Sequence, residues 1–337
     1  MRPALLLLVF TTAVTCSLVA CGGGGGSAAT STSSIQKLPQ GGWPVPTYAA
    51  QSQELIAYNT FNQARVSCGF GYLQQNANLD TAALNHVVWQ FKNNLYQHTE
   101  TPGTVAYTGS SPWERMLAAG YIQGTGAAQA NEVLTYNRPI LAGYGLSAAV
   151  SLLSAPYHLV GLMNSNREVG ISIKTAGPVG SGADLESPGS LPGILLVADM
   201  AANTANPAQL QDPTEVLTYP CAGTVGTATA LLTEVPSPIP SRNFATQPVG
   251  QPIFVQVLKG QVLTLKASSI VKTSDASEVP LAVTLTSDND PNAKLLPNQA
   301  ILIPNLPLAA NTHYSVTIQG THNGKVFVKN FTFTTGT

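Results

Sequence analysis

The chain has 337 residues, of which 44% are hydrophobic and 9% are charged, and its formal net charge at pH 7 is −1. This length is enough for two ordinary domains, each with a sizeable core. Because so few charges provide neither a basic surface for phosphates nor an acidic tail, the composition argues against nucleic acid as a partner.

Residues 1–20 have the pattern of an export signal. Arg2 is followed by an apolar run over residues 5–10 that is too short to span a bilayer. Residues 18–21 (LVAC) resemble the lipobox of bacterial lipoproteins, which implies that Cys21 is acylated after cleavage and anchors the protein in a membrane. By the sorting pattern of such lipoproteins, the absence of Asp after Cys21 implies the outer membrane or the cell surface. An ordinary secretory signal with an accidental cysteine is the alternative.

The tether and the remaining cysteines fit the same interpretation. Residues 21–48 begin with a run rich in glycine, serine and threonine, as a flexible tether does. Cys16 would be removed with the signal, which leaves Cys68 and Cys221 as one pair in an oxidising compartment. We expect a disulfide between them, with two free buried thiols as the alternative. Closing a loop of roughly 150 residues would constrain the unfolded chain by about 5 kcal/mol.

The next part of the chain, residues 49–221, begins with helical patterns. Apolar residues at helical spacing predict helices over residues 51–65 and 79–95, the second with Asn78 as its N-cap. After a loop, Pro112 predicts the first turn of a short helix. Two further helical pieces are expected on either side of Pro156, which cannot continue the first of them.

Strands follow these helices. Residues 169–173 alternate as a half-buried strand does, and residues 193–200 form a more continuous apolar strand. Helices followed by strands predict an α/β domain in which helices cover an antiparallel sheet.

A Pro-rich linker over residues 222–252 predicts a domain boundary. Beyond it, residues 253–337 contain short β-type runs separated by turn residues, which predict a small β-sandwich. Asn323-Gly324 is expected to form a hairpin turn. The predicted strands cover residues 253–258, 262–265, 281–285, 314–318, 326–328 and 331–333.

Several motifs in order resemble the CAP family, the domain shared by cysteine-rich secretory proteins, antigen 5 and pathogenesis-related proteins, also called the SCP-like extracellular domain. They are NTFNQARVSCGFGYLQQNANLDTAALNHVVWQF, QHTE, YTGSSPWERMLAAGY and PYH, and the likeness covers about residues 51–203. The resemblance implies a CAP-type α-β-α sandwich. The closing run LPLAANTHYSVTIQG and NGKVFVKNFTFTTG resembles the last strands of immunoglobulin-like bacterial surface modules.

The resemblance also implies a cleft lined by His98, Glu132 and His158, because some members of the family bind a divalent metal with two histidines and acidic residues at these motif positions. This chain departs from the family pattern. Asn131 stands where glycine usually precedes the glutamate, Leu152 stands where a tryptophan is usual, and no acid occurs between residues 139 and 157. A weakened or absent metal site is therefore one of the open alternatives.

Two imidazoles and a carboxylate are good ligands for zinc or another divalent cation, and three protein ligands leave a position open for water. The alternative is that the two histidines hydrogen-bond Glu132 and the backbone without a metal. We interpret His86 as a packed, hydrogen-bonded histidine, and Glu114-Arg115 as a structural ion pair or a helix-end device.

Three functions remain open from the sequence. The favoured one is a lipid-anchored envelope protein that binds a small ligand or a cell-surface partner through the cleft and is not an enzyme. The second is a metal-dependent hydrolase acting on peptide or cell-wall bonds, although no hydrolase motif is present. The third is a carrier of an apolar ligand such as a lipid.

Overall fold

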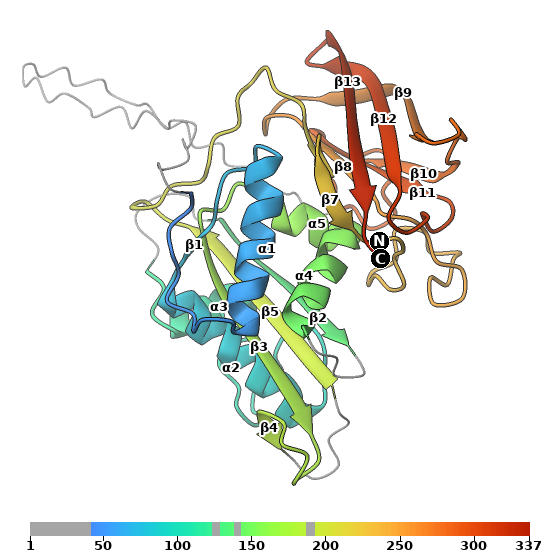
Figure 1. Ribbon diagram of the computed structural model, residues 1–337. Coiled ribbons are helices and arrows are strands. Elements are labelled where there is room, and N and C mark those ends of the chain that lie inside the picture. The colour runs from blue at the N-terminus through green and yellow to red at the C-terminus, as the bar shows by residue number, and fades with distance from the viewer. Residues whose placement is uncertain (1–41, 123–128, 138–142, 187–192) are drawn as a thin grey trace, which may run out of the picture. The chain divides into compact units, whose positions relative to one another are not determined.

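The computed structural model describes residues 42–122, 129–137, 143–186 and 193–337 (Figure 1). The predicted signal peptide, Cys16, the acylation site Cys21 and most of the predicted tether lie outside the described residues. The helices are α1 Gln53–Ser67, α2 Ala77–Asn93, α3 Pro112–Ala118, α4 Tyr144–Ser154 and α5 Pro156–Leu162. The strands are β1 Gln74–Gln75, β2 Gln129–Asn137, β3 Glu168–Gly177, β4 Leu185–Glu186, β5 Gly193–Ala202, β6 Leu217–Tyr219, β7 Thr224–Thr227, β8 Ile253–Gln256, β9 Leu263–Lys272, β10 Leu281–Thr286, β11 Gln299–Pro304, β12 His313–His322 and β13 Lys325–Thr335.

A five-stranded sheet lies among the helices. Its order is β1-β3-β5-β2, with β4 also paired to β3. The three long strands β2, β3 and β5 run antiparallel, whereas β1 and β4 run parallel to β3. Every residue of β5, and every residue of β3 except Lys174, is buried. The half-buried strand expected over residues 169–173 is therefore covered on both faces.

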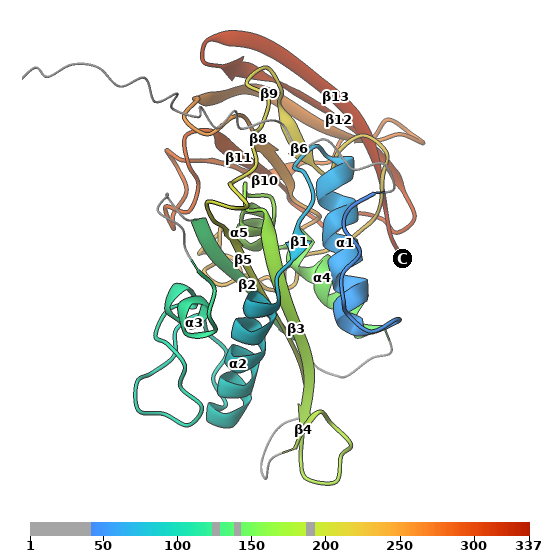
Figure 2. The ribbon, with the colours of Figure 1, turned by 90° about the vertical axis from the view of Figure 1, so that its left-hand side faces the viewer.

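Helix α2 lies directly against β3 (Figure 2). A Cβ atom on Gly170 of β3 would come within 2.0 Å of backbone atoms of Leu79 and Asp80 in the first turn of α2, so only glycine allows this approach. The helix starts at Ala77, two residues earlier than predicted, because the side chain of Asn76, and not that of Asn78, accepts the first free backbone N–H groups.

The remaining strands form two four-stranded sheets, ordered β10-β11-β8-β6 and β7-β13-β12-β9. Side chains of both sheets meet in one apolar core that includes Ile253, Val255 and Leu302 from the first sheet and Val316, Ile318 and Phe333 from the second. The predicted hairpin turn at Asn323-Gly324 joins β12 to β13.

The predicted fold class, a CAP-type α-β-α sandwich followed by a small immunoglobulin-like sandwich, is wrong for this chain. The described residues form five helices and three sheets, and strands hold more residues than helices do. Strand β6 precedes the predicted linker and β7 lies within it, yet they pair with β8 and β13, which follow it. The prediction gave too much weight to helical periodicity, because short strands such as these are stabilised only by partners distant in the chain. The domain boundary at residues 222–252 stays a prediction.

The predicted disulfide between Cys68 and Cys221 is confirmed. It joins the end of α1 to the segment between β6 and β7, with a Cα–Cα distance of 5.4 Å and a sequence separation of 153. In the described part of the chain, no single helix is long and apolar enough to cross a membrane, and α4 with α5 passes such a test only as a pair bent by 103°.

Candidate functional site

The three residues singled out from the sequence come from three different elements. His98 lies in the loop between α2 and α3, Glu132 lies on β2, and His158 lies in the first turn of α5. The structure brings the two imidazoles together, with ring centroids 6.4 Å apart. It places Glu132 behind His98, where Nδ1 of the ring is 2.8 Å from Oε1 of the carboxylate.

His98 and Glu132 differ sharply in exposure. The side chain of His98 is 46% exposed, whereas that of Glu132 is completely buried. The second oxygen of Glu132 accepts a hydrogen bond of 2.5 Å from Nη2 of Arg115, which is also buried. Burial raises the pKa of Glu132, but the hydrogen bond with His98 and the charges of His86 and Arg115 outweigh it and lower that pKa below its ordinary value. Glu132 is therefore an ionised carboxylate that orients His98.

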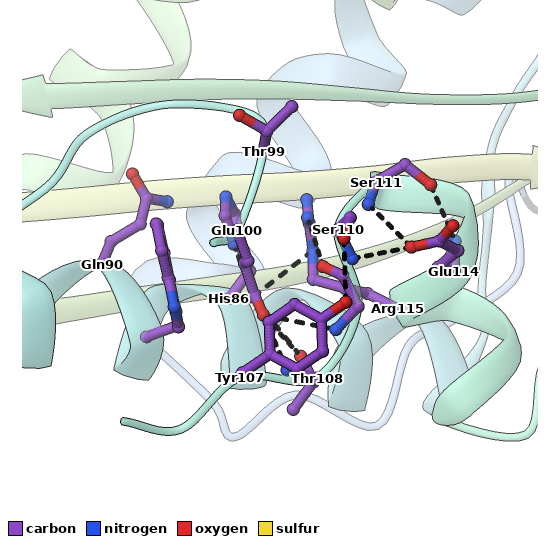
Figure 3. A network of polar contacts seen from close by, with 12 residues as sticks. His86, Gln90, Thr99, Glu100, Tyr107, Thr108, Ser110, Ser111, Glu114 and Arg115 are labelled. Carbon is purple, nitrogen blue, oxygen red and sulfur yellow. Dashed lines mark hydrogen bonds and ion pairs between the residues drawn. The ribbon is translucent and has the colours of Figure 1, made fainter. Parts of the chain in front are cut away.

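His86 and Glu100 form a second buried pair (Figure 3), and Nε2 of His86 lies 3.6 Å from Oε1 of Glu132. Nδ1 of His86 lies 2.9 Å from Oε1 of Glu100, and Nε2 lies 2.8 Å from the carbonyl oxygen of Gln97. The other oxygen of Glu100 accepts the backbone N–H of Thr108 at 2.7 Å. The interpretation of His86 as a packed, hydrogen-bonded histidine agrees with these contacts.

Glu114 and Arg115 do not pair with each other. Glu114 forms a capping box with Ser111 at the start of α3, which Figure 3 shows. Arg115 turns away from it, donates to the carbonyl oxygen of His98 at 3.0 Å, and holds Glu132. Arg115 thus fixes both the loop and the carboxylate of the site.

The sequence reasoning missed Asp199. It lies on β5 directly opposite Glu132 in the register of β2 and β5, and its side chain is fully buried. The two carboxylates are close enough for their charges to interact, yet no regular hydrogen bond reaches either oxygen of Asp199. Burial, followed by the charge of Glu132, raises the pKa of Asp199 well above its ordinary value. An acid inside an apolar strand was the signal that could have identified this residue.

The sequence reasoning also missed Glu234, which lies within the Pro-rich segment. Its buried Oε1 is 3.0 Å from Nδ1 of His158, whose side chain is 16% exposed. The orientation is not that of a regular hydrogen bond, and these buried atoms have no other hydrogen-bond partner, so the contact is a close polar contact between the imidazole and the carboxylate. No sequence signal connects the two residues, because they lie far apart in the chain, His158 on α5 and Glu234 in a segment without helix or strand.

Asn131, which departs from the family pattern, has a structural role. Its Oδ1 accepts hydrogen bonds from the side-chain amides of Asn164 and Asn166, and its Nδ2 donates to the carbonyl oxygen of Gly161. These bonds tie β2 to the end of α5. They hold the helix of His158 in place beside the strand of Glu132.

The geometry does not fit Glu132 as a metal ligand, because His98 and Arg115 occupy its oxygens. Within the described ranges, no three His, Cys, Asp or Glu side chains are grouped to hold a metal ion. Two partly exposed imidazoles remain, each with Nδ1 facing a buried carboxylate. Carboxylates in this position commonly orient histidines whose Nε2 binds a ligand.

Comparisons with known proteins assign no family. No family model and no curated protein matches the chain. Among solved structures, an outer surface protein from Borrelia burgdorferi aligns with 45% of this chain and 95% of its own, at 16% identity and a TM-score of 0.33. A likeness at this level carries no argument about function. The resemblance to the CAP family therefore rests on the sequence motifs alone.

Proposed function

We propose that this protein is an exported binding protein of the bacterial cell envelope that holds a small ligand or a surface partner at the His98–His158 pair. One observation carries the proposal. Two partly exposed imidazoles from separate segments lie with their ring centroids 6.4 Å apart, and each is backed by a fully buried carboxylate side chain. Burying carboxylates costs stability unless they are paired, so the arrangement is typical of a functional site.

The ligand that this donor chemistry favours is a divalent cation such as zinc, bound weakly. The Nδ1 atom of each imidazole faces Glu132 or Glu234, which leaves Nε2 to contact a ligand. Two nitrogen ligands leave the remaining positions of a zinc ion to water or to a partner molecule. In this proposal Glu132 orients His98 and is not itself a ligand.

Isothermal titration calorimetry with zinc chloride tests the proposal. We expect weak binding by the purified protein, and loss of that binding in the double variant His98→Ala with His158→Ala. His313→Ala is the matched control, because His313 is an exposed histidine on β12. Equal heats in the double variant and the control, or no binding by the unaltered protein, would contradict the proposal.

The envelope location is proposed from the export signal and from the LVAC run that ends at Cys21. Labelling of cells with radioactive palmitate should mark the protein, and Cys21→Ser should abolish the label and release the protein from membranes. A labelled Cys21→Ser variant would show that the acylation site is elsewhere.

A carrier of an apolar ligand is a second candidate, favoured by one observation. A cavity of about 450 Å³ lies between α1, α4 and β7, and its apolar lining includes Ala64, Leu146, Val150 and Leu153. Purified protein should then carry a lipid detectable by mass spectrometry, and Val150→Trp should exclude that lipid by filling the cavity. Val262→Trp, at an exposed site that does not line the cavity, is the control.

A further inference from the structure

A groove of about 740 Å³ lies at the open side of the two four-stranded sheets. One wall is strand β13, through Val328 to Phe331. The other is formed by Leu217 and Thr218 of β6, by the segment that precedes β6, and by the disulfide at the end of α1. Strand β6 is the last strand of its sheet, so the groove lies between edges of two different sheets.

Much of β13 is an unpaired edge on this side. Strand β12 pairs with its whole length, but β7 reaches only Phe333 and Thr335 on the other side. Between Lys325 and Phe331, no strand in the described part of the chain pairs with that edge. Free edges of this length attract further strands.

Along the unpaired part of β13, the backbone N–H and C=O groups of every second residue point towards the groove. The carbonyl oxygen of Thr332 accepts the N–H of Gly223, so it points to the β7 side. Because backbone groups alternate in direction along a strand, the N–H and C=O groups of Val326, Val328 and Asn330 point to the same side. Donors and acceptors repeated every second residue match the backbone of another extended chain.

The facing wall supplies a polar contact and negative charge. Thr218 lines the groove and is 1% exposed, and its hydroxyl group has no hydrogen-bond partner. Asp212 and Glu215 also line the groove, where Lys329 is the one cation among the lining residues. One oxygen of Asp212 accepts bonds from Thr214, while Glu215 is exposed without a side-chain partner. The groove therefore favours an occupant with positive charge.

We propose that the groove binds an extended segment of another polypeptide, which adds as a strand to the free edge of β13 and places a Lys or Arg side chain against Asp212 and Glu215. The groove shares no lining residue with the His98–His158 pair, so this proposal is independent of the function proposed above. Main-chain hydrogen bonds to β13 would give the affinity, and the two acids would give the preference for a basic residue.

The probe is a blocked six-residue peptide of alternating lysine and valine, added to the full purified protein. We expect saturable binding by calorimetry, with slowed hydrogen exchange at the amides of Val326, Val328 and Asn330. Asp212→Asn combined with Glu215→Gln should weaken binding roughly tenfold, because two solvent-exposed ion pairs are lost.

Two controls separate strand addition from simple charge attraction. The same peptide with N-methyl groups on alternate residues keeps its charge and loses its strand donors, so it should not bind. Val328→Pro removes one edge donor that the native ladder does not use, and Val328→Thr restores it. Equal binding of the N-methylated peptide, or protection of amides outside β13, would overturn the proposal even if the proline variant failed to fold.

Discussion

Replacing Asp199 by asparagine should stabilise the protein at neutral pH. The carboxyl group is fully buried opposite the ionised Glu132 and has no regular hydrogen-bond partner. Folding therefore desolvates this acid beside a like charge. Asparagine has nearly the same shape, carries no charge, and can donate its amide N–H to Glu132.

The magnitude follows from the cost of leaving a buried polar group without a partner, which is about 1–3 kcal/mol. For a chain of this size, that corresponds to a rise in Tm of roughly 1–4 °C. The size of this gain in stability depends on pH. The pKa of Asp199 is raised in the folded state, so its contribution to stability is most favourable below the ordinary value of 3.8 and is lost as pH rises towards the folded pKa.

Thermal unfolding followed by circular dichroism at pH 4, 6 and 8 measures this effect. The gain from Asp199→Asn should be largest at pH 8 and smallest at pH 4, where the carboxyl group is protonated in the folded state and close to half protonated in the unfolded chain. Asp288→Asn, at an exposed turn position, should change Tm little at any of these pH values. A gain that does not vary with pH, or a loss of stability at pH 8, would refute the reasoning.

Three other changes test the remaining contacts. Arg115→Met removes one partner of a buried ion pair and should lower the free energy of unfolding by about 3–5 kcal/mol in urea titrations, whereas a loss below about 1 kcal/mol would contradict the role given to this pair. Cys68→Ser with Cys221→Ser should cost up to about 5 kcal/mol, and dithiothreitol should then have no further effect on Tm in calorimetry. Glu234→Gln should change the tautomer of His158 in long-range ¹H–¹⁵N spectra while leaving the other histidine signals in place, and an unchanged His158 signal would show that Glu234 does not orient the ring.

Local features of the sequence predicted much of the first half of the chain. Helices α1, α2 and α3, and the break between α4 and α5 at Pro156, follow from apolar periodicity and from proline chemistry within single segments. The disulfide followed from counting the cysteines left after an export signal. These signals depend on neighbours in the chain, so they can be read without a fold.

Several strands were harder to predict. The sequence suggested separate runs at residues 326–328 and 331–333, which form the single strand β13, and it assigned no strand to β2, β6, β7 or β11. Strands β2, β6 and β7 are defined by hydrogen bonds to partners distant in the chain, which are β5, β8 and β13. Short segments without clear alternation carry little of that information.

The sequence by itself determined that His98, Glu132 and His158 are the polar groups to examine. The structure places the rings of His98 and His158 near each other and Glu132 against Nδ1 of His98. Only the tertiary structure decided that Arg115 and Asp199 surround Glu132 and that Glu234 stands behind His158. The physical reason is that the register of β2 and β5 sets Asp199 opposite Glu132, and that the folding of segments distant in the chain brings Arg115 and Glu234 to their partners. Neither depends on the spacing of residues in the sequence.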